Sequence, residues 1–310
     1  MISKMSRNIF FLGKGGTGKT TMAALTALAL AERGEKVALF SMDPAHNLFD
    51  VFQINSSKNS VKIQGGFIIE ELDIQYWIKT YLKSIEEKIA RSYQYVTTLS
   101  LEKNFKTIRF SPGLEEYALH YAFEAVNKMY RDYTCRLFDM PPTALALKFF
   151  NLPKLVLVWL NQLIELRKKI LEKHHIISTV QRDEKTESHD KILNQLYKMQ
   201  NDNQQIVKDL QTNQKSGVYI VLNEDELSIS ESIDILDVIS QIGITINGIL
   251  INKYQDFVNK PDLEKRFSKL PIKFFPLAKI PLIGMSGLRE YLNNNKLEIT
   301  DFVIDMMIHR

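Results

Sequence analysis

Short apolar segments alternate with longer amphipathic segments along most of the chain. The first cycle predicts a buried strand over residues 8–12, a helix over 22–33 that ends at Gly34, and a second strand over 36–41. A continuous apolar run of this length is typical of a strand that is buried on both faces of a parallel sheet. Strands and helices that alternate in this way predict an α/β fold.

The alternation continues through the rest of the chain, apart from one region. We therefore expect one mostly parallel sheet that is flanked by helices, and a last helix that docks on the sheet, because Asp301 and Asp305 give it the wrong charge for an anionic membrane surface. Further strands are expected over 67–72, 133–138, 218–222 and 246–251, with a short edge strand over 273–276, and further helices over 74–96, 113–131, 230–242, 261–270, 287–293 and 299–309.

Residues 155–213 differ from this pattern because they contain no glycine and become rich in Lys, Gln, Asn and Glu. Both halves look helical, and the polar stretch 181–190 between them predicts an exposed connection. We expect a helical insertion that extends from the sheet. The segment 155–170 is apolar around more than one helical stripe, which fits either an open groove for a hydrophobic client or a helix buried on all sides.

A glycine-rich loop follows the first predicted strand and opens the first helix. Its sequence fits the pattern G-x-x-x-x-G-K-[ST], which binds phosphate through backbone N–H groups and the positive end of the helix dipole. In such a loop Lys19 reaches the β- and γ-phosphates and the Thr20 hydroxyl binds Mg²⁺. The sequence therefore predicts a nucleotide site formed by Gly13, Lys14, Gly15, Gly16, Thr17, Gly18, Lys19 and Thr20.

Composition narrows the classes of function. The 310 residues include 40 Lys and Arg against 36 Asp and Glu, and a net charge of +4 does not favour nucleic-acid binding by bulk charge. A single cysteine, Cys135, excludes an intramolecular disulfide and a cysteine-based zinc site within one chain, and we expect it in the core. The longest apolar run, 22–31, is about half of the roughly 20 residues that a membrane span needs. No signal peptide is expected, so we expect a cytoplasmic protein.

Four segments resemble, in this order, motifs of the arsenical pump-driving ATPase family, which includes the ATPase of guided entry of tail-anchored membrane proteins. The resemblance covers most of the chain and is poorest over 150–215. Septum-site and plasmid-partition ATPases and the nitrogenase iron protein share the lysine-containing loop but are less similar at 43–50. The segments are 14–21, DPAHNLFD at 43–50, SPGLEEYA at 111–118 and DMPPT at 139–143, and the later segments 227–231, 249–252 and 280–282 agree.

The resemblance implies an ATPase that uses ATP and Mg²⁺ and works as a homodimer with two nucleotides between its subunits. Lys14 would reach across to the partner's phosphates, and the nucleotide contacts would extend to Thr21. Asp43 in the first switch would orient or deprotonate the attacking water, and Asp139 in the second switch would hold the water shell of Mg²⁺. The local alternatives are a solvated lysine at position 14, and a helix cap or Asx turn at the two aspartates.

The resemblance also assigns nucleotide contacts outside the first loop. Asn252 would contact the adenine ring, with the backbone near Pro281 and Leu282 beside it. Asp225 stands where the family usually has a glutamate that reaches across the dimer. Because acidic residues flank it on both sides, the candidates for this contact are Glu224, Asp225 and Glu226.

The chain departs from the family pattern in two places. After the second switch the family commonly continues Gly-His-Thr-Leu-Arg, whereas this chain has ALALK at 144–148. The targeting members usually carry a Cys-x-x-Cys pair that binds zinc between subunits, and the pump-driving members carry cysteines that bind arsenite or antimonite. One cysteine per chain fits neither arrangement, so no zinc is expected. The adjacent pair His174 and His175 would point to different faces of a helix, which favours solvated side chains over a metal site.

The sequence thus predicts a single P-loop ATPase domain over 1–310, with a core of about 1–73, 132–150 and 216–310 and helical insertions at about 74–131 and 151–215. Its leading function is Mg²⁺-dependent ATP hydrolysis by a homodimer that carries hydrophobic transmembrane segments of client proteins or docks on a membrane-protein receptor. One alternative is an ATPase subunit that energises an anion exporter, although the best-known pump ATPases carry two P-loops in tandem. The other is a regulatory ATPase switch that acts on a protein partner.

Overall fold

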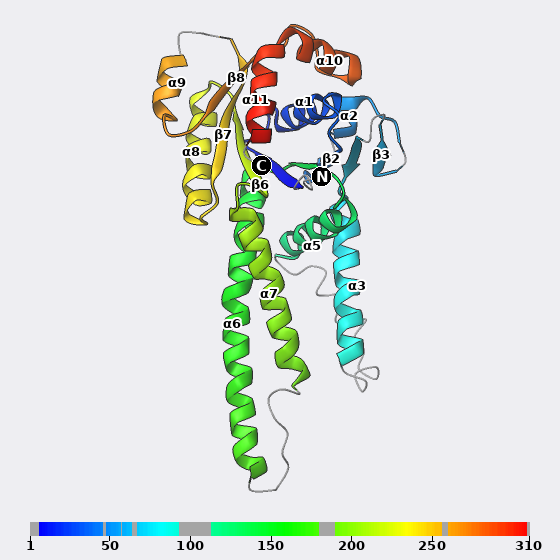
Figure 1. Ribbon diagram of the computed structural model, residues 1–310, viewed down its shortest axis with the longest axis vertical. Coiled ribbons are helices and arrows are strands. Elements are labelled where there is room, and N and C mark those ends of the chain that lie inside the picture. Colours follow the sequence, from blue (N-terminus) through cyan, green and yellow to red (C-terminus); the bar gives the residue numbers. More distant parts are fainter. Residues whose placement is uncertain are drawn as a thin grey trace.

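The computed structural model describes residues 6–45, 48–56, 58–63, 67–92, 113–179, 190–255 and 260–308. An eight-stranded sheet forms its centre, and a long helical arm extends away from it (Figure 1). The predicted α/β fold, a P-loop fold with a mostly parallel sheet between helices, is confirmed.

The sheet has the strand order β3-β4-β2-β5-β1-β6-β7-β8, and every neighbouring pair is parallel except β3 and β4. β1 lies between β5 and β6, so the loop that follows β1 leaves the sheet near its middle. The strands are β1 (Arg7–Leu12), β2 (Val37–Ser41), β3 (Ser60–Lys62), β4 (Ile68–Glu71), β5 (Cys135–Asp139), β6 (Ser216–Leu222), β7 (Ile246–Tyr254) and β8 (Ile272–Pro276).

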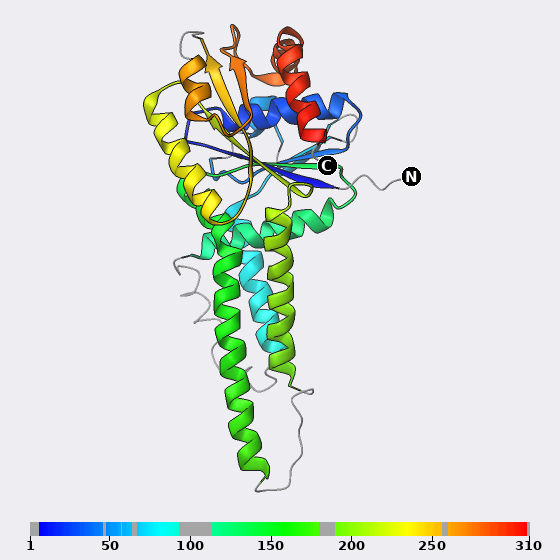
Figure 2. The same ribbon diagram turned by 60° about the vertical axis from the view of Figure 1, so that its left-hand side comes forward.

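Helices cover both faces of this sheet, and Figure 2 shows the resulting layers from a second side. Helices α1, α10 and α11 pack on one face, and α3, α5, α8 and the first turns of α6 pack on the other. The helices are α1 (Lys19–Glu32), α2 (Leu48–Phe52), α3 (Ile74–Ser92), α5 (Leu114–Met129), α6 (Thr143–Thr179), α7 (Lys191–Gln211), α8 (Glu226–Gln241), α9 (Lys260–Arg266), α10 (Gly284–Asn294) and α11 (Lys296–Ile308).

Alternate residues of β1 belong to different cores, which explains why all four residues from Ile9 to Leu12 are apolar. Ile9 and Phe11 are buried with α1 and α11, whereas Phe10 is buried with α5 and α6. The prediction that the last helix docks on the sheet is confirmed, because Phe302 and Val303 are buried in the α1 core. Burial on both faces holds β1, and the loop that follows it, in a fixed position.

Several elements differ from the sequence prediction. Helix α1 begins at Lys19 and not at 22, because Gly18 in the left-handed conformation starts the helix directly after the loop. The strand β3 and the helix α2 were not predicted, since a three-residue polar edge strand and a five-residue helix leave almost no periodic signal. Helix α6 begins at Thr143, well before the expected insertion at 151, and continues through Pro153.

Helices α6 and α7 form most of the arm and lie side by side in both views. Near the far end of α7, the guanidinium of Arg167 contacts the carboxylate of Asp190 at 2.6 Å. The segment Thr143–Lys173 of α6 is long and apolar enough, by length and composition only, to cross a membrane, although only a third of its apolar window is buried. The sequence analysis predicted no membrane span because it considered only uninterrupted apolar runs, and it did not predict a helix as long as α6. Because its first turns pack in the sheet core, with Phe149 and Phe150 buried there, this helix starts as a core element of the ATPase domain.

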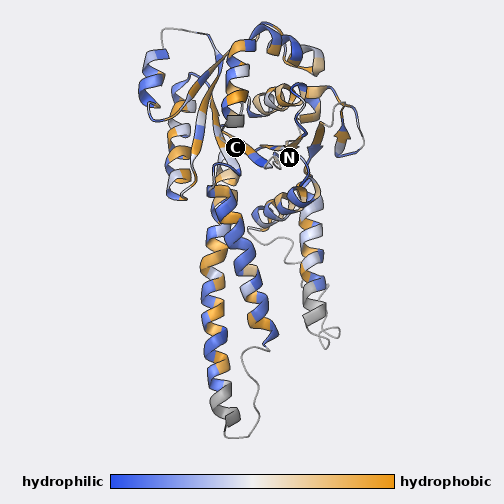
Figure 3. Cartoon of the chain, in the orientation of Figure 1, coloured by the Kyte–Doolittle hydropathy of each residue, from blue (hydrophilic) through white to orange (hydrophobic). Residues whose placement is uncertain are grey.

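The exposed side of α6 carries six large apolar side chains, which we call the apolar stripe. Neighbours along the stripe are three or four residues apart, except for the adjacent pair Val158 and Trp159, so they follow one face of the helix, and each is between 43% and 65% exposed. Leu160 and Ile164, on another side of the helix, are buried. Figure 3 shows the resulting apolar bands along the arm. The expectation of a helix buried on all sides is therefore wrong for the stripe, which consists of Leu155, Val158, Trp159, Leu163, Leu166 and Ile170.

Some predicted features lie outside the described residues, so the structure does not bear on them. They are His46 and Asn47 of the first switch, Ser111 and Pro112, the polar stretch 181–189, and the side chains of His174 and His175.

Candidate functional site: a phosphate loop between two switch aspartates

Three chemically important segments meet at the carboxyl edge of the sheet. The glycine loop follows β1, Asp43 follows β2, and Asp139 is the last residue of β5. The strands are in register there, because Asp139 lies opposite Phe11 of β1 and Ser41 of β2. Parallel neighbours that end at one level bring the three segments together, which is the usual place for a ligand in an open α/β sheet.

The shape of the glycine loop depends on two glycines with positive φ. Gly13 has φ 145°, and a Cβ placed there would lie 2.0 Å from the carbonyl oxygen of Val221 in β6. Gly18 has φ 91°, and a Cβ there would meet the side-chain amide of Asn252 at 2.2 Å. Only glycine fits both the dihedral angle and the space at these positions.

Two lysines and one hydroxyl hold two carbonyl groups of the loop and so fix its shape. The Nζ of Lys19 donates to the carbonyl oxygen of Lys14 at 3.2 Å, and the Thr17 hydroxyl donates to the same oxygen at 2.9 Å. Lys253 at the end of β7 donates to the carbonyl oxygen of Gly16 at 2.9 Å. Sequence reasoning missed Lys253, and its only signal was that it directly follows Asn252.

Thr20 and Asp139 form the centre of the predicted Mg²⁺ site. The Thr20 hydroxyl donates to Oδ2 of Asp139 at 2.7 Å. Asp139 is buried, and burial raises its pKa to about 7 against the opposing effects of Thr20 and Lys19. Its other oxygen, Oδ1, is buried without a hydrogen-bond partner among the described residues.

This donor set fits Mg²⁺. Hard oxygen ligands, one hydroxyl and one carboxylate with a spare oxygen, suit an ion that keeps several waters and is completed by phosphates. A nearby cation would favour the charged form of Asp139 and so reverse the effect of burial. Among the described residues there is no cluster of three or more His, Cys, Asp or Glu that could hold a metal.

The structure shows local roles for two of the other predicted carboxylates. Asp43 is half-buried, and its Oδ1 accepts from the N–H of Ala45 at 3.0 Å, so it forms the Asx turn that was the local alternative. Asp225 caps helix α8 by accepting from the N–H of Ser228 at 2.8 Å. A turn aspartate still presents its second oxygen, so the water-positioning role of Asp43 and the cross-dimer role of Asp225 both stay predictions.

Asn252 lies against the loop as a support. Its side-chain amide donates to the carbonyl oxygen of Thr17 at 2.8 Å, and the residue is buried. Pro281 and Leu282 lie in the loop between β8 and α10. The adenine contacts of Asn252, Pro281 and Leu282, and the nucleotide contact of Thr21 in α1, remain predictions.

A set of contacts connects the second switch to the helices behind it. The hydroxyl of Thr143, at the start of α6, donates to Glu231 of α8 at 2.5 Å. The amine of Lys148 in α6 contacts the carboxylate of Glu116 in α5 at 2.8 Å. Burial is the largest single effect and would raise the pKa of Glu116, but the hydrogen bond and charge of Lys148, together with a backbone hydrogen bond, outweigh burial and lower the pKa. The segment that departs from the family pattern therefore ties α6 to α5.

A second α5–α6 contact compensates for the proline inside α6. Pro153 has no N–H, so the carbonyl of Phe149 lacks its helical partner. The Nε2 of His120 in α5 lies 2.5 Å from that oxygen, and its ring stacks on the ring of Phe149. Since a carbonyl can only accept, His120 carries its proton on Nε2. Sequence reasoning did not find this contact, because the spacing between 120 and 149 contains no pattern.

Comparison with known proteins identifies the family of this chain. The family described as anion-transporting ATPase matches residues 6–289. A protein of Aquifex aeolicus assigned as arsenical pump-driving ATPase 2 is 27% identical over 304 residues, which are 92% of this chain and 97% of the relative. The ATPase ASNA1 homolog of Entamoeba dispar is 25% identical and covers 79% of this chain and 75% of its own length.

A third relative is more similar over a shorter stretch. The ATPase get3 of Schizosaccharomyces pombe is 33% identical over 148 residues, 47% of this chain and 43% of its own length. A family match over nearly the whole chain, with a complete phosphate loop between two switch aspartates, places this protein in the anion-transporting ATPase family as an ATP-hydrolysing P-loop enzyme.

Proposed function

We propose that this chain is a Mg²⁺-dependent, cytoplasmic ATPase that cycles through a nucleotide-bridged homodimer and carries hydrophobic segments of membrane proteins. The observation that supports the carrier role most is the exposed apolar stripe. It lies on the helix whose first turn, at Thr143, comes four residues after the switch aspartate Asp139. Nucleotide state and client binding would then act on one rigid element.

The hydrolytic step needs little covalent chemistry from the protein. Phosphoryl transfer is accelerated mainly by positioning and by positive charge near the phosphates. Lys19 and the loop N–H groups would bind the phosphates, Thr20 and Asp139 would hold Mg²⁺, and Asp43 would orient the water. Bound Mg²⁺ would neutralise the charge that develops on the phosphate oxygens.

The site also suggests how hydrolysis would reach the arm. Release of phosphate would change the charge that faces Asp139, and the following segment connects through Thr143 to α8 and through Lys148 to α5. Because α6 is continuous from Thr143 to Thr179, a small rotation at its first turn would displace the stripe. An exposed stripe of this size on a single chain is unusual without a partner, and a transmembrane helix has the matching chemistry.

A transport role remains the second candidate, because three of the relatives with broad coverage are assigned as arsenical pump-driving ATPases. Cys135 is the single cysteine and is buried in β5. A metalloid site of several thiolates therefore has no exposed cysteine to use in this chain. This favours the carrier role over activation by arsenite or antimonite.

Mixing two inactive variants would test the homodimer and the cross-subunit role of Lys14 together. Lys14→Ala and Asp43→Asn should each reduce ATP turnover about a hundredfold or more. In a mixed dimer, the Lys14→Ala subunit keeps its own Asp43 and receives Lys14 from its partner, so one site is complete. An equal mixture should recover about a quarter of wild-type turnover, since half of the random dimers are mixed and each has one active site.

The matched control pairs Lys19→Ala with Asp43→Asn. Lys19 acts within its own subunit, so neither site of that mixed dimer is complete and no recovery is expected. Differently tagged subunits would show by co-purification that mixed dimers form with ATP. If they form and the Lys14→Ala mixture stays inactive, Lys14 does not act across the interface.

Substitution in the apolar stripe would test the carrier role. Trp159→Glu should reduce recovery of a soluble complex with a co-expressed single transmembrane segment about tenfold or more, because a charge in the stripe opposes burial of the client. Asn161→Asp is the control, since Asn161 is exposed on the same helix outside the stripe, and Asp adds the same charge while it keeps an acceptor for the amide of Gln200. ATP turnover without client should stay unchanged in both. Equal recovery by wild type and Trp159→Glu would contradict the carrier role and favour a regulatory switch.

A further inference from the structure

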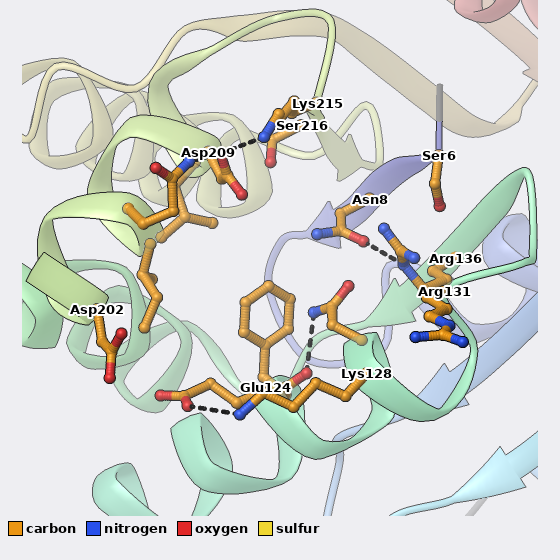
Figure 4. Close-up of a pocket in the computed structure, with 15 residues that line it drawn as sticks. Ser6, Asn8, Glu124, Lys128, Arg131, Arg136, Asp202, Asp209, Lys215 and Ser216 are labelled. Atoms are coloured by element: carbon orange, nitrogen blue, oxygen red, sulfur yellow. Dashed lines mark hydrogen bonds and ion pairs between the residues drawn. The ribbon is translucent and has the colours of Figure 1, made fainter. Parts of the chain in front are cut away.

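A cavity lies at the edge of the sheet opposite the phosphate loop. Its volume is about 640 Å³, which is in the range of sites for small organic ligands. It is bounded by the amino ends of β1, β5 and β6, by α5 on one side and by α7 of the arm on the other. Figure 4 shows the residues that line it. None of them belongs to the nucleotide site described above.

The floor of the cavity is a row of polar side chains on three adjacent strands. Arg136 of β5, Asn8 of β1 and Ser216 of β6 are partners in register, so they point to the same face of the sheet. The next row on that face consists of Phe138, Phe10 and Val218, which are buried in the core. All three polar residues are themselves buried, which costs free energy unless each polar group finds a partner.

Arg136 is the buried cation of this row. Its Nε donates to Oδ1 of Asn8 at 2.7 Å, and Nη1 donates to the carbonyl oxygen of Tyr130 at 3.3 Å. Burial lowers its pKa to about 10. Among the described residues no carboxylate oxygen lies within 4.0 Å of its guanidinium. The direct hydrogen-bond partners of this guanidinium are therefore neutral, while the charge of Asp209 acts on it and opposes the effect of burial on its pKa. A buried guanidinium without a directly bound carboxylate can pair with an oxyanion.

Two further groups on the cavity wall lack partners within the described part of the chain. The Oγ of Ser216 and Oδ1 of Asn127 are both buried without a hydrogen bond. The Ser216 hydroxyl can donate to an anionic ligand, whereas Oδ1 of Asn127 can only accept and therefore suits an ordered water. They lie at the same cavity as Arg136 but come from two different elements, β6 and α5.

The rest of the lining restricts the ligand to one negative charge and an apolar body. Phe123 of α5 and Ile206 and Leu210 of α7 provide apolar surface. On the side away from Arg136, the carboxylates of Glu124 and Asp209 pair with Lys128 and Lys215. Figure 4 shows Asp202 and Asp209 across the cavity from Arg131 and Arg136. The lining has four cationic and three anionic side chains, and its net charge of +1 matches a monoanion better than a polyanion such as a nucleotide or pyrophosphate.

We infer that this cavity is a binding site for a small organic monocarboxylate with an apolar body, whose carboxylate pairs with Arg136 and whose body packs on Phe123, Ile206 and Leu210. The ligand would bridge the sheet, α5 and the arm helix α7.

Calorimetric titration of the full-length protein with octanoate tests this inference. Wild type should bind octanoate saturably, with octanol, octylamine and pyrophosphate each at least about tenfold weaker, because only octanoate offers one negative charge with an apolar chain. Arg136→Gln should weaken octanoate binding about tenfold or more. Ile206→Trp, which fills the cavity without touching the arginine, should weaken it as strongly.

Lys269→Gln serves as the control for the loss of one positive charge, because Lys269 is exposed and distant from the cavity in the fold. It should bind octanoate like wild type. Thermal unfolding would show which variants are folded. If Arg136→Gln does not fold, Ile206→Trp still tests the inference. No saturable octanoate binding to folded wild type at about 10 mM would overturn the inference. Equal binding of octanol, or unchanged binding by Ile206→Trp, would do the same.

Discussion

Gly13→Ala is expected to abolish high-affinity ATP binding and to destabilise the whole domain. The added Cβ would lie 2.0 Å from the carbonyl oxygen of Val221, and φ 145° is a conformation that alanine rarely adopts. Backbone atoms cannot move aside as a side chain can, so β6 must shift away from β1 or the loop must change shape. We expect a loss of about 2–4 kcal/mol in the free energy of unfolding and a decrease of about tenfold or more in ATP affinity.

Substitutions at two other glycines separate the effect of the contact with Val221 from the effect of the positive φ. Gly34→Ala has the same kind of positive φ, at 82°, but no atom within 4 Å, so it should cost only about 1 kcal/mol and leave ATP binding unchanged. Gly15→Ala lies in the loop itself, with open space around its Cβ and no positive φ, so it should leave the unfolding free energy close to wild type. Urea denaturation and titration with a fluorescent ATP analogue give both quantities. If Gly13→Ala resembles Gly34→Ala in both, the contact with Val221 does not define the loop.

The second large effect is a loss of stability at mildly acidic pH through His120. Burial lowers the pKa of His120 to about 4, against 6.5 for an exposed histidine. The unfolded chain therefore binds a proton at a higher pH than the folded chain does. His120 contributes its full stability above pH 6.5, and that contribution falls as the pH decreases from 6.5 to 4. The total loss is about 3 kcal/mol, because each pKa unit corresponds to roughly 1.4 kcal/mol.

The comparison with His120→Gln isolates this contribution from other titrating groups. Glutamine retains an N–H donor for the carbonyl of Phe149 but does not titrate. Between about pH 7.5 and pH 5 the difference in unfolding free energy between wild type and His120→Gln should shift by about 2 kcal/mol in favour of the variant. His120→Phe leaves the Phe149 oxygen without a donor and should be less stable than His120→Gln by about 1–3 kcal/mol at all of these pH values, since neither side chain titrates. A pH-independent difference for His120→Gln would show that His120 is not held neutral.

The phosphate loop could be predicted from sequence because its chemistry is local. The glycines, Lys19 and Thr20 are contiguous, and the apolar strand before them and the helix after them are fixed by short-range periodicity. The roles of the two switch aspartates came from the family resemblance of their segments, while the strand pattern placed Asp43 two residues after one predicted strand and Asp139 directly after another. The fold class followed from the same alternation of strands and helices, and the eight-stranded sheet confirms it.

The arm shows where sequence reasoning stopped. The segment 155–170 was apolar on more than one stripe, which predicts equally well a buried helix and an open surface. The structure distinguishes a buried helix from an open surface, because Leu160 and Ile164 are buried. Trp159 and Leu163 are exposed. That separation depends on which side of α6 faces α7, and helix orientation is set by packing between segments far apart in the chain.

The amino-acid sequence was sufficient to identify an α/β P-loop ATPase, because the glycine-rich loop, the strand patterns and the motif spacing each depend on residues that are close together in the chain. Tertiary structure alone decided the contacts that connect this site to the rest of the molecule. His120 meets the carbonyl left free by Pro153, Asn252 supports the loop at Thr17, and Arg136, Asn8 and Ser216 form one row across three strands. Strand order and helix docking bring such residues together across separations of 29 to 235 positions, which no local pattern records.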